Sequence, residues 1–323
     1  MSSIHQLIKH LKDHHNIKVN NNQVQSLRNI GYYHGYKGYR FIHTPNQKIN
    51  FSSLNEILTL NKFDMQLKTI FYPKVMFIEN ALKSYVLEAT LENSNSENLD
   101  VIFNTTITDY KTYQPGSKQY KDQYKKRMSL KGKINNTLLR DYTNRKQTVT
   151  HFFNTDKPIP IWAVFESLSL GEFGTFFSCS NLNVKLKTSS FFQLPTNLDS
   201  DGKITEYMIY TLKDLRNAIA HNNTIFDTRF QSNSINHRLI FLLENEIGIT
   251  NLDFKYIGSY IILITYILRK MGETKTECNK FISSFEKCTD LLRTKISPNI
   301  CNKILGTQQR NHLQQLKLFI ANN

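Results

Sequence analysis

The chain has 323 residues, of which 40% are hydrophobic, and 41 Lys and Arg against 26 Asp and Glu leave a net charge of +15. This length and composition suffice for a buried core and exclude a disordered chain. The positive charge favours polyanionic partners, with nucleic acid first, because each neutralised phosphate releases condensed counterions.

Membrane insertion and cysteine chemistry are both disfavoured by the sequence. The most apolar segment, residues 257–268, is too short to cross a bilayer and predicts a buried helix instead. Nothing near Met1 resembles a signal peptide, so we expect a cytoplasmic protein. The four cysteines lack zinc or disulfide spacing, and we expect reduced thiols, no metal and no other cofactor.

Residues 1–50 form the first predicted region. Two apolar stripes within residues 4–30 predict two short helices in a helix-turn-helix-like arrangement. The segment GYYHGYKGYRF at 31–41 predicts a turn-rich loop or a short hairpin. Within this segment, Tyr36 and Arg40 are suited to stack on bases and to contact phosphates of RNA. The alternative is that the Tyr rings wedge the segment onto the core.

Residues 51–323 form the second predicted region, which is mostly α-helical. Apolar residues at steps of three and four predict a helix over about 61–90, kinked at Pro73. Glu79 lies beside that stripe and is expected to face a neighbouring helix or a pocket, with a solvent-facing or ion-paired position as the alternative.

Further helices are predicted in the second half of the chain. Trp162, Phe165 and Leu168 share one face of a helix that Gly171 is expected to end, and core packing is the favoured role for that face. Two more helical stretches are predicted at about 236–269 and 276–295.

A basic region spans residues 107–146, where eleven basic residues against three Asp give +8. Tyr residues are interleaved with the basic ones, a mixture typical of single-stranded RNA binding. A solvated helix face is the alternative. The predicted RNA contacts are Lys118, Lys121, Lys125, Lys126, Arg127, Lys131 and Lys133.

The segment LRNAIAHNNTIF at 215–226 carries the candidate chemistry. An amphipathic helix is predicted to begin near Thr205 and to stop at Asn222, which puts His221 in its last turn. Asn217 and His221 share a face, but Arg216 is rotated from His221 by about 140°. One helix therefore cannot easily aim both cationic groups at one phosphate, which predicts either a dimeric site or a second Arg/His source within the chain.

These residue types suit metal-independent RNA cleavage. RNA carries its own nucleophile, the 2′-hydroxyl, so the protein needs only a base, an acid and a cation near the developing phosphorane charge. His221 can act as acid or base, whereas Arg216 stays protonated and would hold the phosphate. Asn217 would orient the imidazole or bind the ribose.

RNAIAH resembles the Arg-x(4–6)-His signature of HEPN domains. GYYHGYKGY, KVMFIENALKSY, PIPIWAVFESLSLGEFGTFF and LRNAIAHNNTIF resemble segments of the Abi family of phage abortive-infection proteins, in the same order. The resemblance covers roughly residues 5 to 270.

The resemblance implies an α-helical HEPN bundle, here with an N-terminal helical extension and an inserted basic region. It also implies a homodimer that cleaves RNA without a metal, as a toxin against phage. Arg216, Asn217 and His221 match the motif, and Glu79 is added from the IEN segment. Relatives often carry His or Arg soon after the motif His, whereas Asn222 and Asn223 stand here.

Two other functions remain open at this stage. Some relatives are controlled by a small structured RNA, so the chain could be a non-catalytic HEPN dimer that binds such an RNA in a toxin–antitoxin pair. A third reading is a DNA-binding regulator that uses the N-terminal helices.

Overall fold

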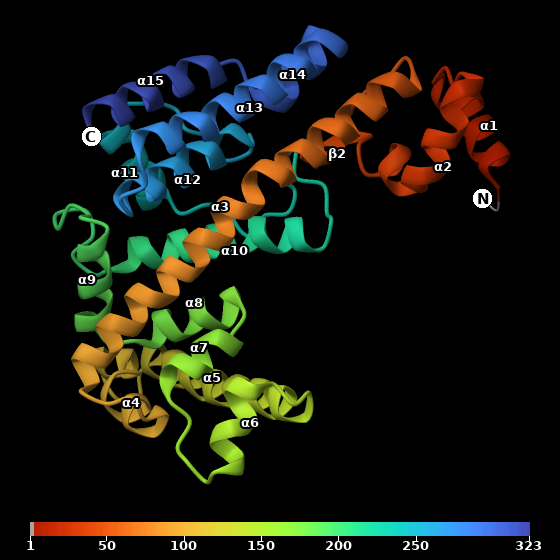
Figure 1. Cartoon of the computed structure of the whole chain (residues 1–323). Helices are drawn as coiled ribbons and strands as arrows, with labels where there is room; N and C mark the ends of the chain where they lie inside the picture. Colours follow the sequence, from red (N-terminus) through yellow and green to blue (C-terminus); the bar gives the residue numbers. More distant parts are fainter. Residues whose placement is uncertain (1–2) are drawn as a thin grey trace. The chain divides into compact units, whose positions relative to one another are not determined.

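Helices account for almost all regular structure in this computed structural model, which describes residues 3–323. The fold is all-α, as predicted, with one short antiparallel hairpin among the described residues (Figure 1). The hairpin joins β1 (Phe41–Ile42) to β2 (Thr44–Lys48).

The chain divides into two compact units. Unit 1 comprises the chain up to Val75 together with Asp214–Ser234 and Leu243–Asn323, and unit 2 comprises Met76–Lys213 and Ile235–Leu242. The helices α3 (Leu54–Ser94), α10 (Lys203–Ala220) and α11 (His237–Ile247) contribute residues to both units. This division does not follow the boundary at residue 50 that the sequence suggested.

Unit 1 is built on a buried helix near the C-terminal end of the chain. Every residue of α12 from Gly258 to Leu268 is buried, which confirms the buried helix predicted from its apolar run. The helices α13 and α15 pack against α12 and against each other (Figure 1). The helices that lie wholly in unit 1 are α1 (Ile4–His15), α2 (Val24–Tyr32), α12 (Gly258–Lys270), α13 (Lys275–Lys295), α14 (Pro298–Leu305) and α15 (Gln309–Asn322).

The two short N-terminal helices are confirmed as α1 and α2, but the Tyr- and Gly-rich segment after them is not a loop. It continues from α2 into a π-helical turn, η2 (Tyr33–Lys37), and the hairpin begins only at Phe41. Gly31 adopts a φ of 69°, which lets the backbone turn before η2. The prediction of a loop or hairpin over 31–41 is therefore wrong for its first half.

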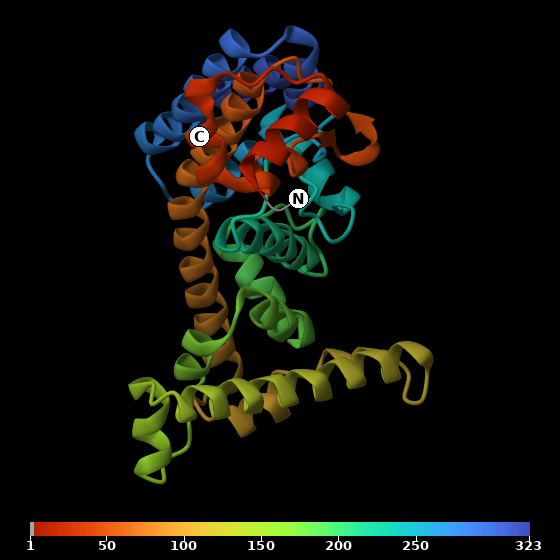
Figure 2. The ribbon, with the colours of Figure 1, turned by 90° about the vertical axis from the view of Figure 1, so that its right-hand side faces the viewer.

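Unit 2 is organised around the long helix α5, which contacts α6, α7, α8 and the 3₁₀ turn η3 (Asp109–Thr112). Figure 2 shows the N-terminal half of α5 extending past the shorter helices of its unit. The helices that lie wholly in unit 2 are α4 (Leu99–Thr105), α5 (Lys118–Thr143), α6 (Gln147–Asn154), α7 (Ile161–Ser167), α8 (Leu170–Cys179) and α9 (Leu182–Phe191).

Two details around α7 and α8 differ from expectation. Gly171 does not end a helix, because the Ser169 side chain caps the start of α8 and Glu172 closes a capping box. Phe165 and Leu168 are buried as predicted, but Trp162 is 39% exposed and rests edge-on against Phe152. The expectation that Trp162 belongs to the core was wrong.

The remaining helix predictions hold in outline. α3 is longer than predicted and runs through Pro73. The stretch predicted at 236–269 is interrupted between α11 and α12, and α14 and α15 were not anticipated. The four cysteines are buried thiols, and burial raises the pKa of Cys179 and Cys278 to about 11. Among the described helices, none combines the length and apolar character needed to cross a membrane.

Candidate functional site

The candidate motif lies at the C-terminal end of α10, as predicted, and the helix ends in a Schellman motif. The Asn223 N–H donates to the Ala218 carbonyl at 2.8 Å, and the Asn222 N–H donates to the Ile219 carbonyl at 3.1 Å. Asn222 adopts the left-handed conformation, with a φ of 52°. His221 is therefore the C-cap residue, and its backbone is fixed by bonds on both sides.

The structure places Arg216 and Asn217 near the C-terminal end of this helix, and His221 directly follows its last residue, Ala220. Arg216 and Asn217 are half-buried, and the Arg216 Nη1 donates to the Asn217 Oδ1 at 3.3 Å. The backbone carbonyl of Asn217 accepts the His221 N–H at 3.0 Å. The His221 side chain is exposed, so its ring can meet a ligand from solvent.

A buried ion pair on α3 fixes the loop that follows His221. The Asp64 Oδ1 accepts the backbone N–H groups of Ile225 and Phe226 at 2.7 and 2.9 Å. The Asp64 Oδ2 pairs with the Lys68 Nζ at 2.8 Å, and the same Nζ donates to the Asn222 Oδ1 at 2.9 Å.

Both partners of this pair are nearly inaccessible to solvent, with Asp64 at 0% and Lys68 at 6% exposure. Burial raises the pKa of Asp64, although Lys68 and the two backbone N–H groups counteract this rise. The pair thus anchors the backbone on the C-terminal side of His221 to a separate helix. Asp64 and Lys68 were missed from the sequence, where their only signal is an acid and a lysine four residues apart inside an apolar helix.

The Tyr- and Gly-rich segment packs against the same loop. The Arg229 Nη2 donates to the Gly38 carbonyl at 2.6 Å, and the Tyr39 ring lies 5.6 Å from the Phe226 ring. A Cβ at Gly38 would lie 3.0 Å from the Tyr33 ring and 3.3 Å from the Thr224 methyl group, so no larger residue fits without a shift. Two segments far apart in the sequence therefore pack against each other next to the motif.

His34, in this same segment, is a second histidine close to the anchoring pair. Burial lowers its pKa, and the charge of Lys68 lowers it further, while Asp64 acts in the opposite direction. The imidazole of His34 is thus held toward its neutral form.

The predicted RNA contacts in this segment must be revised. Tyr36 is 1% exposed and its ring packs 4.6 Å from the His15 ring, so it offers no face to a base. The alternative, in which the Tyr rings wedge the segment onto the core, describes Tyr36 and Tyr39. Arg40 is half-buried and lies 4.5 Å from the centre of the Phe41 ring.

Glu79 lies in unit 2, whereas Arg216, Asn217 and His221 lie in unit 1. Its side chain is 4% exposed and pairs with the Lys83 Nζ at 3.3 Å, and Lys83 also donates to the Leu168 carbonyl at 2.9 Å. This is the ion-paired arrangement considered as the alternative for Glu79. Its catalytic role remains a prediction.

Most of the basic region at 107–146 forms α5. The RNA contacts predicted there are either exposed lysines or residues bonded to other elements of the same unit. Lys118, Lys121 and Lys125 are exposed on the N-terminal half of the helix. Lys131 and Lys133 are also exposed, and Lys131 lies 3.5 Å from Asp100.

Lys126 and Arg127 instead hold α5 to its own unit. Lys126 donates to the Ser178 hydroxyl and lies 3.7 Å from Glu206. The Arg127 guanidinium donates to the carbonyls of Ile107 and Phe103 at 3.0 and 2.9 Å. These contacts give Lys126 and Arg127 a structural role, and their contact with RNA stays a prediction.

Comparison with known proteins agrees with the four segments picked out by resemblance. A family model described as Abi-like protein matches residues 25–227, more than half of the chain, and all four segments lie inside it. This chain belongs to the Abi-like protein family. Membership in the Abi-like family indicates an abortive-infection function. No curated protein and no solved structure matches the chain.

Proposed function

We propose that this Abi-like protein is a metal-independent RNA endonuclease of HEPN type that acts in abortive infection. The observation that supports this most directly is the end of α10. There an exposed His221 follows Arg216 and Asn217 at the end of the helix, on a backbone anchored by buried contacts. Catalysis requires that the surrounding residues fix the position of a catalytic group, and the contacts of Asp64 and Lys68 fix the backbone next to His221.

In this mechanism, the chemistry is divided among few groups. His221 transfers a proton to or from the ribose-phosphate link, and Arg216 stabilises the charge that develops on the phosphorane. Asn217 positions the ribose or the imidazole. Attack by the 2′-hydroxyl breaks the P–O5′ bond, which leaves a 2′,3′-cyclic phosphate and a 5′-hydroxyl end.

A second proton-transfer group is required, and two sources are open. In a homodimer it is His221 of a second copy, brought across a two-fold axis. Within one chain it is His34, whose lowered pKa favours the neutral imidazole that a general base needs. A strand of RNA would be held by the exposed lysines of α5, as in other electrostatic grips on single strands.

The deciding experiment compares His221→Ala with His237→Ala, since His237 is also exposed but stands at the start of α11. We expect His221→Ala to lower cleavage of single-stranded RNA by about 10²- to 10⁴-fold, the usual contribution of a general acid or base. RNA affinity should stay unchanged, and His237→Ala should cleave like the wild type.

Two outcomes contradict this proposal in different ways. An inert wild type that binds a structured RNA tightly would support the second candidate, a non-catalytic dimer that holds a regulatory RNA. Equal cleavage by both variants would remove His221 from the chemistry. The end groups of the products, read by mass spectrometry, test the attack by the 2′-hydroxyl independently.

A further inference from the structure

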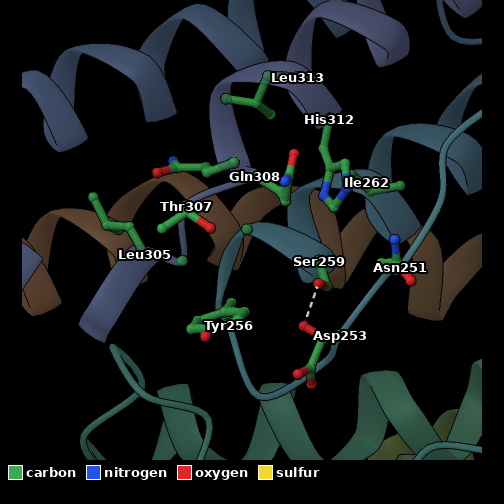
Figure 3. Close-up of a pocket in the computed structure, with 13 residues that line it drawn as sticks. Asn251, Asp253, Tyr256, Ser259, Ile262, Leu305, Thr307, Gln308, His312 and Leu313 are labelled. Atoms are coloured by element: carbon green, nitrogen blue, oxygen red, sulfur yellow. Dashed lines mark hydrogen bonds between the residues drawn. The ribbon is translucent and has the colours of Figure 1, made fainter. Parts of the chain in front are cut away.

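A small polar cavity lies in unit 1 at the start of α15, outside the region matched by the family model (Figure 3). Its volume is about 120 Å³. That is several times the space one water needs and less than a drug-sized ligand fills, so the cavity suits a single ring. Ile262, Leu305 and Leu313 line it with apolar surface, and Asn251, Gln308 and His312 add polar groups.

One of the cavity's polar groups is buried without a hydrogen-bond partner. Gln309 is 6% exposed, and its Oε1 accepts from the Arg293 Nη2 at 3.0 Å. Because a guanidinium can only donate, this contact fixes the amide orientation and leaves the Gln309 Nε2 as a donor. That nitrogen has no hydrogen-bond partner among the described residues. The nitrogen itself has almost no accessible surface, so an acceptor in the cavity would reach it only after the amide shifts.

The start of α15 adds further donors. Its N-cap residue, Gln308, makes no side-chain capping hydrogen bond. The first N–H groups of a helix have no partner within the helix, and they carry the positive end of its dipole. The cavity therefore offers hydrogen-bond donors beside apolar surface, which suits the carbonyl and ring nitrogens of a flat heterocycle.

A second, larger hollow of about 460 Å³ shares Tyr256 with this cavity. It is lined by Lys48, Lys255 and Lys303 together with His43. All three lysines are exposed, and among the described residues the acid paired with them is Asp253, 2.7 Å from the Lys255 Nζ. The two hollows place an aromatic ring between a ring-sized cavity and a cationic surface.

The two hollows differ in which part of a ligand they favour. A phosphate in the smaller cavity would lose its hydration against Ile262 and Leu313 and would face the Asp253 carboxylate, which also lines that cavity. A neutral base loses far less on entering the same space. The lysines of the larger hollow suit a phosphate instead, because it stays partly hydrated there.

We propose that these hollows bind one nucleotide, with its base in the cavity at the start of α15 and its phosphate on the lysine-lined surface. The Tyr256 side chain, which lines both hollows and has the Lys255 Nζ 5.0 Å from its ring centre, contacts the ribose between them. The ligand is either a free nucleotide or one unstacked nucleotide of an RNA strand, since both present the same chemistry. This site does not depend on RNA cleavage at His221.

The test measures binding by calorimetry with the full-length chain. The probes are the four nucleoside 5′-monophosphates, inorganic phosphate and a short single-stranded RNA, the last with the His221→Ala variant so that the strand stays intact. We expect Tyr256→Ala to weaken nucleotide binding by about two- to tenfold, because it removes the side-chain surface that both hollows share. Tyr256→Phe should bind like the wild type, which controls for folding.

The phosphate half of the site has its own matched pair of variants. Lys303→Gln should weaken nucleotide binding by about two- to fivefold, the usual effect of one exposed ion pair. Lys287→Gln removes the same charge from an exposed position on α13 that lines neither hollow, and it should have no effect.

If the free monophosphates bind, and Tyr256→Ala and Lys303→Gln weaken this binding while the two controls do not, the ligand is a free nucleotide. If only the RNA strand binds with these responses, the ligand is a nucleotide of RNA. The proposal is overturned if neither probe binds, if inorganic phosphate binds as tightly as the nucleotides, or if Tyr256→Ala and Lys287→Gln behave alike. Cleavage is measured separately, so a failure here leaves the role of His221 untouched.

Discussion

The end of α10 and the helix α5 both carry the cationic residues that make this sequence conspicuous, but the two regions use them differently. At the end of α10, an exposed His221 stands on a backbone that Asp64 and Lys68 hold from a distant part of the chain. On α5, Lys118, Lys121 and Lys125 extend into solvent from a single continuous helix. The first region depends on tertiary contacts for its geometry, and the second depends only on being a helix.

This difference shows that the role of a charged residue depends on its contacts in the fold. Lys68 and Arg127 resemble surface cations in the sequence, yet one is buried against a carboxylate and the other is bonded to two carbonyls. Substitutions should therefore damage the fold where a cation has protein partners, and weaken only RNA binding at the exposed lysines of α5.

The largest effect is expected at the ion pair below the motif. Asp64→Ala leaves a buried ammonium without its counter-charge and two backbone N–H groups without an acceptor. We expect a loss of about 3–5 kcal/mol in the free energy of unfolding, measured by denaturant titration. Asp122→Ala, at an exposed position on α5, is the control and should change stability little. Similar losses in both variants would mean that the pair does not anchor the loop.

A smaller effect is expected at Asn222. Asn222→Ala removes the acceptor for Lys68 and puts a residue with a Cβ but no local hydrogen bond into the left-handed conformation. It should cost about 1–2 kcal/mol in unfolding free energy. Asn222→Gly tolerates that conformation and should cost less. If the two variants lose the same stability, backbone conformation is not what Asn222 contributes.

At the exposed lysines of α5 the expected effect is on binding alone. Changing Lys118, Lys121 and Lys125 together to Gln should weaken the affinity for single-stranded RNA and reduce its salt slope by about 2, since each lost phosphate contact removes about 0.7. The melting temperature should not change. Arg127→Gln should instead lower the melting temperature, because two buried carbonyls lose their donor. An unchanged salt slope in the triple variant would mean that this helix face is only solvated.

The smallest effect concerns pH. The pKa of His34 is lowered in the folded chain by burial and by Lys68, so the unfolded chain binds the proton first as the pH falls below about 6.5. Stability present at pH 7.5 is then lost progressively on acidification. His34→Gln should lose less stability between pH 7.5 and 5.5 than the wild type, measured by thermal melts at both values. An identical loss would show that His34 does not contribute.

Local patterns in the sequence predicted the helices and the place of the motif. The apolar run of α12, the stripe along α3 and the polar stop after Ala220 each depend on neighbours a few residues away, so they could be read directly. The place of His221 at a helix end follows from the same reasoning.

What could not be predicted depends on contacts between distant residues. Tyr36 has the same neighbours in sequence as a base-stacking tyrosine, and only the packing of His15 against it shows that it is buried. Gly171 is a different case, because the signal was local: the Ser169–Glu172 capping box starts α8 immediately before it, so this glycine stands inside a helix. Lys126 and Arg127 look no different from Lys125 until their partners on other elements are known.

Unit 1 is assembled from three separate stretches of chain, and this limits how the protein can be shortened. A polypeptide trimmed to residues 25–227 would keep Arg216 and His221 but would lose α12 to α15, including the Phe281 ring that packs 6.0 Å from Phe71. It would also lose both partners of the hydrogen bond that the Thr228 hydroxyl donates to the Lys255 carbonyl at 3.0 Å, just beyond the motif. Such a fragment would expose apolar residues of unit 1 that are buried in the intact chain. Aggregation of the truncated form would therefore say nothing about the chemistry of the intact protein.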